Sequence, residues 1–259
     1  MTVAFSDAEL DRYARQLVLR EIGGAGQQKL KAARVLIVGA GGLGSPAALY
    51  LAAAGVGVIG LADPDEVAVS NLQRQILFGL ENVGLPKVEA GAARLAELNP
   101  FVKVRPLRAR IDSSNAAEVA AGFDLVLDGT DDFASRFAVN AGCYAASRAL
   151  VSGAIGRWAG QVAVFEAGLT RGRPLAERKP CYQCLVREAP PEAETCAAVG
   201  ILGALAGVVG AMMAAEAVKL ITGAGEPLSG RLLLYDALTA EARTVALHPD
   251  PRCPVCGTA

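Results

Sequence analysis

The chain has 259 residues, 53% of them apolar, with 25 basic and 26 acidic side chains and a net charge of −1. This size and composition suffice for one large core, so we expect a single domain over residues 1–259. The balanced charge excludes a strongly basic nucleic-acid surface and a polybasic membrane patch. The N-terminal residues lack the basic and apolar regions of a signal peptide, which predicts a cytoplasmic protein.

The first half of the chain alternates strand-like and helical patterns. Ser6 and Glu9 form a capping-box pattern, which predicts an amphipathic helix over residues 7–19 within an N-terminal helical region, 1–30. Strands are then predicted at 35–38, 56–62, 102–107, 123–128 and 150–154, and helices at 46–54, 87–98, 115–121 and 134–147. This alternation predicts an α/β fold with a doubly wound, largely parallel Rossmann-like sheet, whose nucleotide-binding core spans residues 31–156.

The pattern changes in the second half, residues 157–259. Short strands near turns are predicted at 161–166, 231–236 and 243–247, and we expect them to continue the sheet in antiparallel fashion. Residues 171–180 and 189–194 are predicted to be polar loops. Residues 197–215 carry no charge and could span a membrane by length, but their glycines and alanines make them weakly hydrophobic. A buried, closely packed helix is the better interpretation.

A G-x-G-x-x-G turn, Gly39 to Gly44, follows the first apolar strand and precedes an alanine-rich helix. Glycines there, including Gly41 and Gly42, bring backbone N–H groups close to phosphate oxygens and direct the positive end of the helix dipole at them. The motif predicts a mononucleotide or dinucleotide site, and its usual interpretation is an NAD-dependent enzyme.

Two acidic positions follow neighbouring strands of the predicted sheet. Asp63 and Asp65 come after the second strand, where a Rossmann acid binds ribose, although turn or capping aspartates would look the same. Asp131 and Asp132 follow the strand that ends at residue 128. Carboxylates there hold Mg²⁺ beside phosphates, and capping of the next helix is the alternative.

Basic and amide side chains follow in residues 71–75 and at Lys87. Arg74 and Lys87 suit a triphosphate whose charge must be neutralised while a phosphoanhydride bond breaks, which a plain NAD site does not require. Asn71 and Gln75 flank Arg74 in the same stretch. For any one of these residues, a solvated surface position is the alternative.

The six cysteines divide into four and two. Cys181 with Cys184 and Cys253 with Cys256 form two C-x-x-C pairs, which together predict a structural Zn²⁺ site that joins the C-terminal segment to the loop after the sheet. A redox dithiol, free thiols and, least favoured, disulfides are the alternatives.

Three further residues bear on catalysis. Cys143 lies in an apolar helical pattern and is predicted to be a core residue. Cys196 follows a proline-containing loop and precedes a helix, so it is a candidate nucleophile, with an inert thiol as the alternative. His248 is the only histidine, which argues against a Ser-His-Asp triad and histidine-assisted hydride transfer. Adenylyl transfer needs no histidine base, because the attacking carboxylate is already ionised.

The ordered set of these motifs resembles the ThiF/MoeB/HesA family, bacterial relatives of ubiquitin-activating enzymes, over nearly the whole chain. The resemblance implies ATP-dependent adenylation of the C-terminal glycine of a small ubiquitin-like sulfur-carrier protein, with release of pyrophosphate, for thiamine or molybdopterin biosynthesis. It further implies roles for the motif residues as ligands of the nucleotide (Gly41, Gly42), the ribose (Asp63), the phosphates (Asn71, Arg74, Gln75, Lys87), Mg²⁺ (Asp131) and Zn²⁺ (Cys181, Cys184, Cys253, Cys256).

The resemblance also concerns partners. Arg15 matches the arginine that reaches into the neighbouring subunit's site, which implies a homodimer, and Cys196 matches a position that can link covalently to the carrier. Asp132 and Ala204 depart from the common Asn and Pro of the family, which we expect to adjust activity rather than abolish it. The given sequence stops three residues after its last cysteine, so we expect no C-terminal rhodanese domain and a separate protein as the sulfur donor. An NAD-dependent oxidoreductase and a non-catalytic zinc-stabilised scaffold are the competing interpretations.

Overall fold

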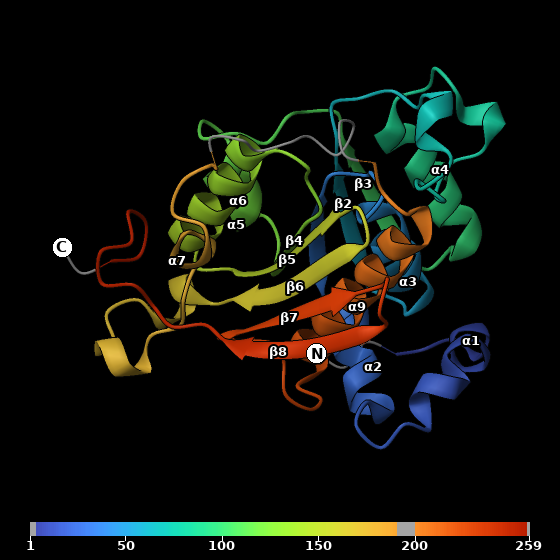
Figure 1. Ribbon diagram of the computed structural model, residues 1–259. Coiled ribbons are helices and arrows are strands. Elements are labelled where there is room, and N and C mark those ends of the chain that lie inside the picture. The colour runs from blue at the N-terminus through green and yellow to red at the C-terminus, as the bar shows by residue number, and fades with distance from the viewer. Residues whose placement is uncertain (1–3, 191–199, 258–259) are drawn as a thin grey trace.

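The computed structural model describes residues 4–190 and 200–257 and contains an eight-stranded sheet in the order β3-β2-β1-β4-β5-β6-β7-β8 (Figure 1). Strands β1 to β5 are parallel, and β6, β7 and β8 continue the sheet in antiparallel fashion. This topology confirms the predicted doubly wound sheet and its antiparallel continuation. The strands are Arg34–Val38 (β1), Val58–Ala62 (β2), Lys103–Leu107 (β3), Leu125–Asp128 (β4), Ala149–Gly156 (β5), Ala159–Phe165 (β6), Arg231–Asp236 (β7) and Glu241–Ala246 (β8).

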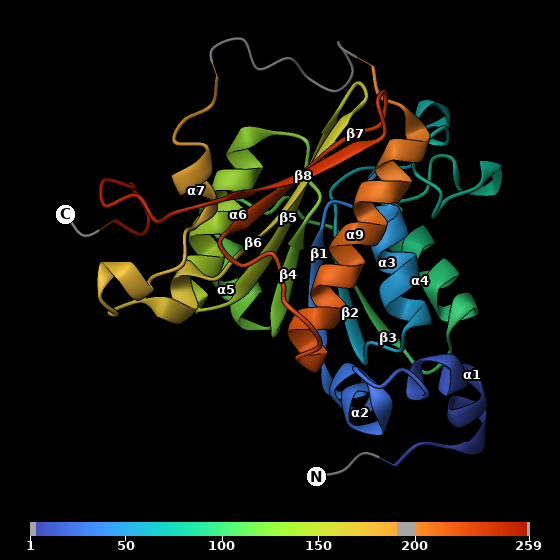
Figure 2. The same ribbon diagram turned by 60° about the horizontal axis from the view of Figure 1, so that its bottom comes forward.

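Helices cover both faces of the sheet and complete a three-layer arrangement (Figure 2). Helices α3, α4 and α9 lie on one face, and α5, α6 and α7 lie on the other. The helices are α1 (Asp7–Leu17), α2 (Gly23–Ala32), α3 (Gly44–Ala53), α4 (Lys87–Leu98), α5 (Ala116–Ala121), α6 (Phe133–Ala146), α7 (Tyr182–Leu185) and α9 (Gly203–Thr222), with short 3-10 helices η1 (Val69–Asn71), η2 (Leu80–Asn82), η3 (Ala167–Thr170) and η4 (Leu175–Glu177).

The continuous apolar run of β1 is explained by burial on both faces of the sheet. Val35 and Ile37 pack into the cluster beneath α3 and α9, whereas Leu36 and Val38 pack into the cluster beneath α5 and α6. Successive side chains of a strand point to opposite faces, so a strand covered by helices on both sides has no polar face.

Element boundaries differ from the expected ones by a few residues, because the terminal residues of several predicted elements belong to turns. Strand β2 begins at Val58 rather than at residue 56, since Gly55, with φ +84°, belongs to the turn after α3. Strand β4 begins at Leu125 rather than at residue 123, whose N–H still donates to the end of α5. Helix α1 ends at Leu17 instead of residue 19.

Helix α9 corresponds to the uncharged segment of the second half, and it begins and ends later than residues 197–215. Among the described residues it is the one helix long and apolar enough to cross a membrane, with a mean hydropathy of 1.7. It packs in the core against α3: a Cβ atom at Gly210 would lie 2.4 Å from Pro46 Cγ and 2.5 Å from Leu43 O. The predicted buried, closely packed helix is therefore confirmed.

The N-terminal helices attach to the end of α3 that is remote from its glycine turn. Asn99 bridges Tyr13 Oη and the Ala52 carbonyl oxygen at 2.9 and 2.7 Å, and all of this contact is buried. Gln16 and Gln27 both donate to the carbonyl oxygen of residue 54. Helix α1, whose predicted capping box is present, is thereby fixed to the core.

Candidate active site

The glycine turn joins β1 to α3 with a geometry that only glycine permits at two positions. Gly39 has φ +89°, and a Cβ atom at Gly44 would lie 1.8 Å from the Gly39 carbonyl oxygen. No side chain of the described residues caps the N-terminus of α3 at Leu43. The N–H groups of the first turn and the positive end of the helix dipole are therefore directed at the space above the sheet, as an anion site requires.

A cavity of about 330 Å³ lies over this turn, at the carboxyl ends of the parallel strands. It spans the point between β1 and β4 where the strand order reverses, the position at which open α/β sheets bind ligands. Its lining brings together segments that follow four strands and the helix of the first C-x-x-C pair. The lining includes Gly41, Gly42, Asp63, Asp65, Arg74, Gln75, Lys87, Thr130, Asp131, Asp132, Arg136 and Tyr182.

Asp63 connects the end of β2 to the glycine turn. Its carboxylate is 5% exposed and accepts hydrogen bonds from the Ala40 and Asp65 N–H groups at 2.8 and 2.9 Å. Burial raises the pKa of Asp63, and the charge of Lys87 and the two backbone donors oppose that rise only in part. The residue is thus both a turn carboxylate and a wall of the cavity.

Lys87 begins helix α4 and is buried beside the two aspartates that follow β2. Its Nζ lies 3.0 Å from Asp65 Oδ2 and 3.7 Å from Asp63 Oδ1, and its side chain is only 7% exposed. A solvated surface position is therefore wrong for this lysine. The arrangement holds an ammonium group at the cavity wall, paired with two carboxylates.

Arg74 and Gln75 reach the cavity, whereas Asn71 does not. The aliphatic part of Arg74 packs over Gly42, where a Cβ atom would lie 3.4 Å from Arg74 Cγ. Gln75 is 4% exposed, and its Oε1 has no hydrogen-bond partner among the described residues. Asn71 does not line the cavity, and its Oδ1 accepts from the Ala68 N–H at 3.3 Å. Its predicted contact with phosphates stays a prediction.

The two aspartates after β4 have different positions. Asp132 caps α6 by accepting from the Ser135 N–H at 2.8 Å, and it lies 3.7 Å from Arg110, so the capping interpretation holds for this residue. Asp131 is exposed and lines the cavity. Of these two aspartates, only Asp132 caps the helix, and Asp131 therefore remains as the candidate Mg²⁺ ligand.

A buried ion pair below this loop was missed by the sequence interpretation. Arg136 is 7% exposed and its Nη1 lies 3.6 Å from Oδ2 of the fully buried Asp128. The guanidinium also donates to Ser152 Oγ and to the Thr130 carbonyl oxygen. The signal in the sequence was an arginine near the start of an otherwise apolar helix, four residues after the N-cap. Charged residues are buried in a core almost only when they are paired.

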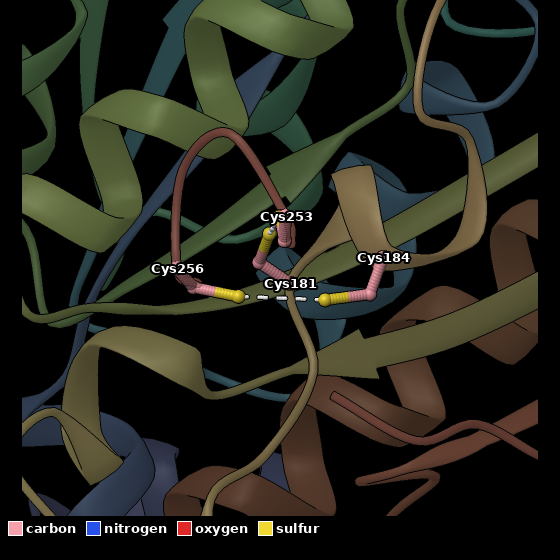
Figure 3. A group of neighbouring side chains, drawn as sticks. All are labelled: Cys181, Cys184, Cys253 and Cys256. Atoms are coloured by element: carbon pink, nitrogen blue, oxygen red, sulfur yellow. Dashed lines mark hydrogen bonds between the residues drawn. The ribbon is translucent and has the colours of Figure 1, made fainter. Parts of the chain in front are cut away.

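The four paired cysteines converge, although the pairs are far apart in sequence (Figure 3). Their Sγ atoms all lie within 4.8 Å of one another, with 3.5 Å between Cys181 and Cys253 and 3.4 Å between Cys184 and Cys256. Disulfides are about 2.05 Å long, which excludes disulfide bonding in this arrangement. A tetrahedral Zn²⁺ site with bonds of about 2.3 Å separates its sulfurs by about 3.8 Å, which fits these contacts.

Contacts among the thiols favour the thiolate form of Cys184, whereas the pKa values of Cys181 and Cys256 are raised. Hydrogen bonds from Cys181 and Cys256 lower the pKa of Cys184, and the Asp250 N–H donates to the same sulfur at 3.4 Å. A thiolate is the form that Zn²⁺ binds, so the donor set is that of a closed structural metal site.

The other residues singled out in the sequence lie outside the cavity. Cys143 is buried and burial raises the pKa of its thiol, which confirms a core residue. Arg15, on α1, and His248 are exposed and do not line the cavity. Cys196 and most of the loop predicted at 189–194 lie outside the described residues.

The model of the ThiF family matches residues 13–255, nearly the full length of the chain. The chain belongs to the ThiF family. The match includes the glycine turn, the cavity residues of β2 and β4 and three of the four clustered cysteines, so the family assignment covers the site as well as the fold.

Relatives of similar length carry names that describe one kind of reaction. The chain is 48% identical to the sulfur carrier protein adenylyltransferase of Thermus thermophilus, over 96% of this chain and 91% of the relative. It is 46% identical to the molybdopterin-synthase adenylyltransferase of Salmonella typhimurium, over 97% and 98%. It is 45% identical to the SAMP-activating enzyme E1 of Haloferax volcanii, over 99% and 92%.

Solved structures share the fold of this ThiF family chain. The structure of E. coli MccB with ATP superimposes with a TM-score of 0.80 at 25% identity, covering 95% of this chain and 74% of MccB. MccB with MccA-N7isoASN gives a TM-score of 0.83 at 24% identity, covering 95% and 75%. The mixed sheet is therefore that of MccB.

Proposed function

We propose that the protein transfers the adenylyl group of ATP to the C-terminal glycine carboxylate of a small ubiquitin-like sulfur-carrier protein and releases pyrophosphate. It is an adenylyltransferase, as are its relatives over almost their full lengths. The observation that carries the proposal is the set of groups in one cavity: the glycine turn at the start of α3, the buried Lys87, and Asp131. These groups suit a triphosphate that is consumed.

The chemistry requires positioning and charge neutralisation rather than a proton acceptor. The carrier carboxylate is ionised at neutral pH, attacks the α-phosphorus, and forms an acyl–phosphate bond as the bond to the leaving pyrophosphate breaks. Arg74 and Lys87 neutralise the charge that develops on the leaving group, and the N-terminus of α3 binds phosphate oxygens. Asp131 would hold Mg²⁺, which supplies further charge neutralisation at the phosphates.

Asp63 is assigned to the ribose. Each oxygen of its carboxylate accepts one hydrogen bond, Oδ2 from the Ala40 N–H and Oδ1 from the Asp65 N–H, and the residue lines the cavity beside the glycine turn. A hydroxyl donor of the nucleotide would complete the coordination of this buried carboxylate. Asp65 contributes through Lys87, to which it is bonded at 3.0 Å.

The position of Arg15 supports a homodimer with composite sites. Helix α1 is fixed to the end of α3 that is opposite its glycine turn, and a ten-residue helix is about 15 Å long. Arg15 therefore lies far from the cavity of its own chain. We assign it to the cavity of a second subunit, where a positive charge would complete the phosphate site.

The four-cysteine cluster is assigned to structural Zn²⁺. It would tie the tail of residues 253–256 to α7, which lines the cavity through Tyr182. Cys196 is kept as a candidate for covalent linkage to the carrier, and a separate protein donates the sulfur. The pathway is thiamine or molybdopterin biosynthesis, carried out in the cytoplasm.

An NAD-dependent oxidoreductase is the alternative that the glycine turn alone would allow. The buried ammonium group of Lys87 beside two carboxylates favours ATP, because a dinucleotide pyrophosphate needs no such charge at the cavity wall. The likeness to MccB, solved with ATP, supports the same choice.

Pyrophosphate exchange tests the proposal. The purified chain is incubated with ATP, Mg²⁺, labelled pyrophosphate and candidate carriers that end in Gly-Gly, and label entering ATP is measured. Exchange should require the carrier and disappear with a carrier that lacks its terminal glycine. NAD binding without exchange for any carrier would overturn the proposal, and a chain that shows no exchange but keeps its affinity for the carrier in Arg74→Ala and Lys87→Ala variants would favour a scaffold.

A further inference from the structure

A buried polar network lies between the four-cysteine cluster and the loop that carries Asp131. The loop is held from below by the Asp128 carboxylate, which accepts from the Thr130 N–H at 3.0 Å and from Thr130 Oγ1 at 2.7 Å. Arg136 donates to the carbonyl oxygen of the same Thr130 and pairs with Asp128. Both polar groups of the Thr130 backbone are thus fixed by one buried ion pair.

Arg136 is in turn covered by a residue of the first cysteine pair. Tyr182, between the two ligands Cys181 and Cys184, places its ring with the centroid 6.0 Å from the Arg136 guanidinium carbon. The ring is 3% exposed and is itself held by Phe165, with centroids 5.8 Å apart at 89°. A guanidinium group on a desolvated aromatic face has a fixed plane, so Tyr182 restricts the orientation of Arg136.

Asn140 provides the second connection, one helical turn after Arg136 on the same face of α6. Its Oδ1 accepts from the Tyr182 N–H at 2.8 Å, and its Nδ2 donates to Cys181 Sγ at 3.6 Å. The carboxamide is 2% exposed and is satisfied on both sides by the C-x-x-C segment. Helix α6 therefore contacts the C-x-x-C segment at two points: Asn140 binds the Tyr182 backbone, and Arg136 contacts the Tyr182 ring.

We propose that Asn140, Tyr182 and Arg136 are positioning residues that connect the four-cysteine cluster to the loop of residues 129–132 and thereby set the position of Asp131 in the cavity. The inference rests on the function proposed above for Asp131. The cluster then does more than retain the C-terminal tail, because an ordered C-x-x-C segment orients Arg136, and Arg136 holds the carbonyl group next to Asp131.

The Mg²⁺ dependence of exchange tests this coupling, because partners behind a metal ligand alter metal affinity. Tyr182→Leu should raise the half-saturating Mg²⁺ concentration about tenfold, the size expected for such partners. Zinc content should stay at about one per chain, since the four thiolates are unchanged. Tyr182→Phe keeps the ring over Arg136 and removes only the hydroxyl group, which also interacts with Arg136, so it should shift the Mg²⁺ dependence less than Tyr182→Leu does.

A matched control exists on the same helix. Tyr144 of α6 stacks on Arg171 at 4.2 Å, packs against the cysteine cluster and does not line the cavity, so Tyr144→Leu removes a comparable cation–π contact that does not involve Arg136. It should leave the Mg²⁺ dependence unchanged. Arg136→Lys, which keeps the charge beside Asp128 but loses the planar donor geometry, should reproduce the shift of Tyr182→Leu.

Hydrogen exchange gives a readout that is independent of activity. Asn140→Leu should accelerate exchange of the Tyr182 amide, and Tyr182→Leu should accelerate exchange of the Thr130 amide. Unchanged Mg²⁺ dependence in both Tyr182→Leu and Arg136→Lys, or an equal shift in Tyr144→Leu, would overturn the inference. A wild-type chain without pyrophosphate exchange would overturn the proposed function instead, and the Thr130 amide would still decide whether the network positions the loop.

Discussion

Replacing Lys87 by methionine tests the electrostatics of the cavity wall. The pair with Asp63 is buried on both sides at 3.7 Å, which at an effective dielectric constant of about 20 corresponds to an attraction of about 4.5 kcal/mol. The Asp65 side chain is 61% exposed, so its pair with Lys87 adds at most about 1 kcal/mol. Removing the ammonium group also relieves its own desolvation, and we expect a net loss of about 2–3 kcal/mol at pH 8.

The loss should depend on pH in a direction set by Asp63. Burial already raises the pKa of this carboxyl, and loss of Lys87 removes the main opposing charge and raises it further. The folded variant then retains a proton that the unfolded chain releases above its ordinary pKa, so its stability falls as pH rises through the raised pKa. The destabilisation relative to wild type should therefore be smaller at pH 5 than at pH 8.

Urea denaturation at both pH values and pyrophosphate exchange at pH 8 provide the measurements. Exchange should fall by at least about a hundredfold, as expected when a charge at a developing anion is removed. Lys31→Met is the matched control, because Lys31 pairs with the buried Glu9 at 2.7 Å on the remote N-terminal helices. It should lose stability and keep exchange. Full stability and full exchange in Lys87→Met would refute the electrostatic reasoning.

Other substitutions separate the remaining roles. Asp131→Asn should weaken the Mg²⁺ response of exchange and leave the denaturation midpoint unchanged, whereas Asp132→Ala should cost about 1 kcal/mol through loss of the α6 cap and leave the Mg²⁺ response intact. Inactive Arg15→Ala and Lys87→Met chains, mixed and allowed to form dimers, should regain about a quarter of wild-type exchange. Half of the dimers are then mixed, and each mixed dimer has one intact site of two. No recovery would contradict the action of Arg15 across subunits. Cys253→Ser should abolish stoichiometric zinc by metal analysis, and full retention of zinc would exclude this cysteine as a ligand.

Local patterns account for the parts of the site that depend on the backbone. The turn was predicted correctly from Gly39 and Gly44, because only glycine fits at both positions. Gly39 has a positive φ, and a Cβ atom at Gly44 would lie 1.8 Å from a carbonyl oxygen. The alternation of apolar strands and helices predicted the parallel sheet, since connections of that length allow only crossover packing. The two C-x-x-C pairs predicted one cluster because four thiols at that spacing share one metal-binding geometry.

Side-chain roles that depend on neighbours could not be assigned in the same way. Asp131 and Asp132 are adjacent residues of the same type, so the sequence cannot tell which of them is the metal ligand. The hydrogen bond from the Ser135 N–H identifies Asp132 as the helix cap. Arg136 has no motif of its own, because its function arises from contacts with Asp128 and Tyr182, which come from a neighbouring strand and from the distant C-x-x-C segment.

The sequence by itself determined the order of strands and helices, the nucleotide turn and the set of clustered cysteines, all of which follow from local spacing. Only the tertiary structure decided that Lys87 is buried between Asp63 and Asp65 and that Tyr182 covers Arg136. The physical reason is that burial and charge pairing depend on which segments the sheet brings together. The separation of two residues along the sequence does not say whether they are in contact in the folded chain.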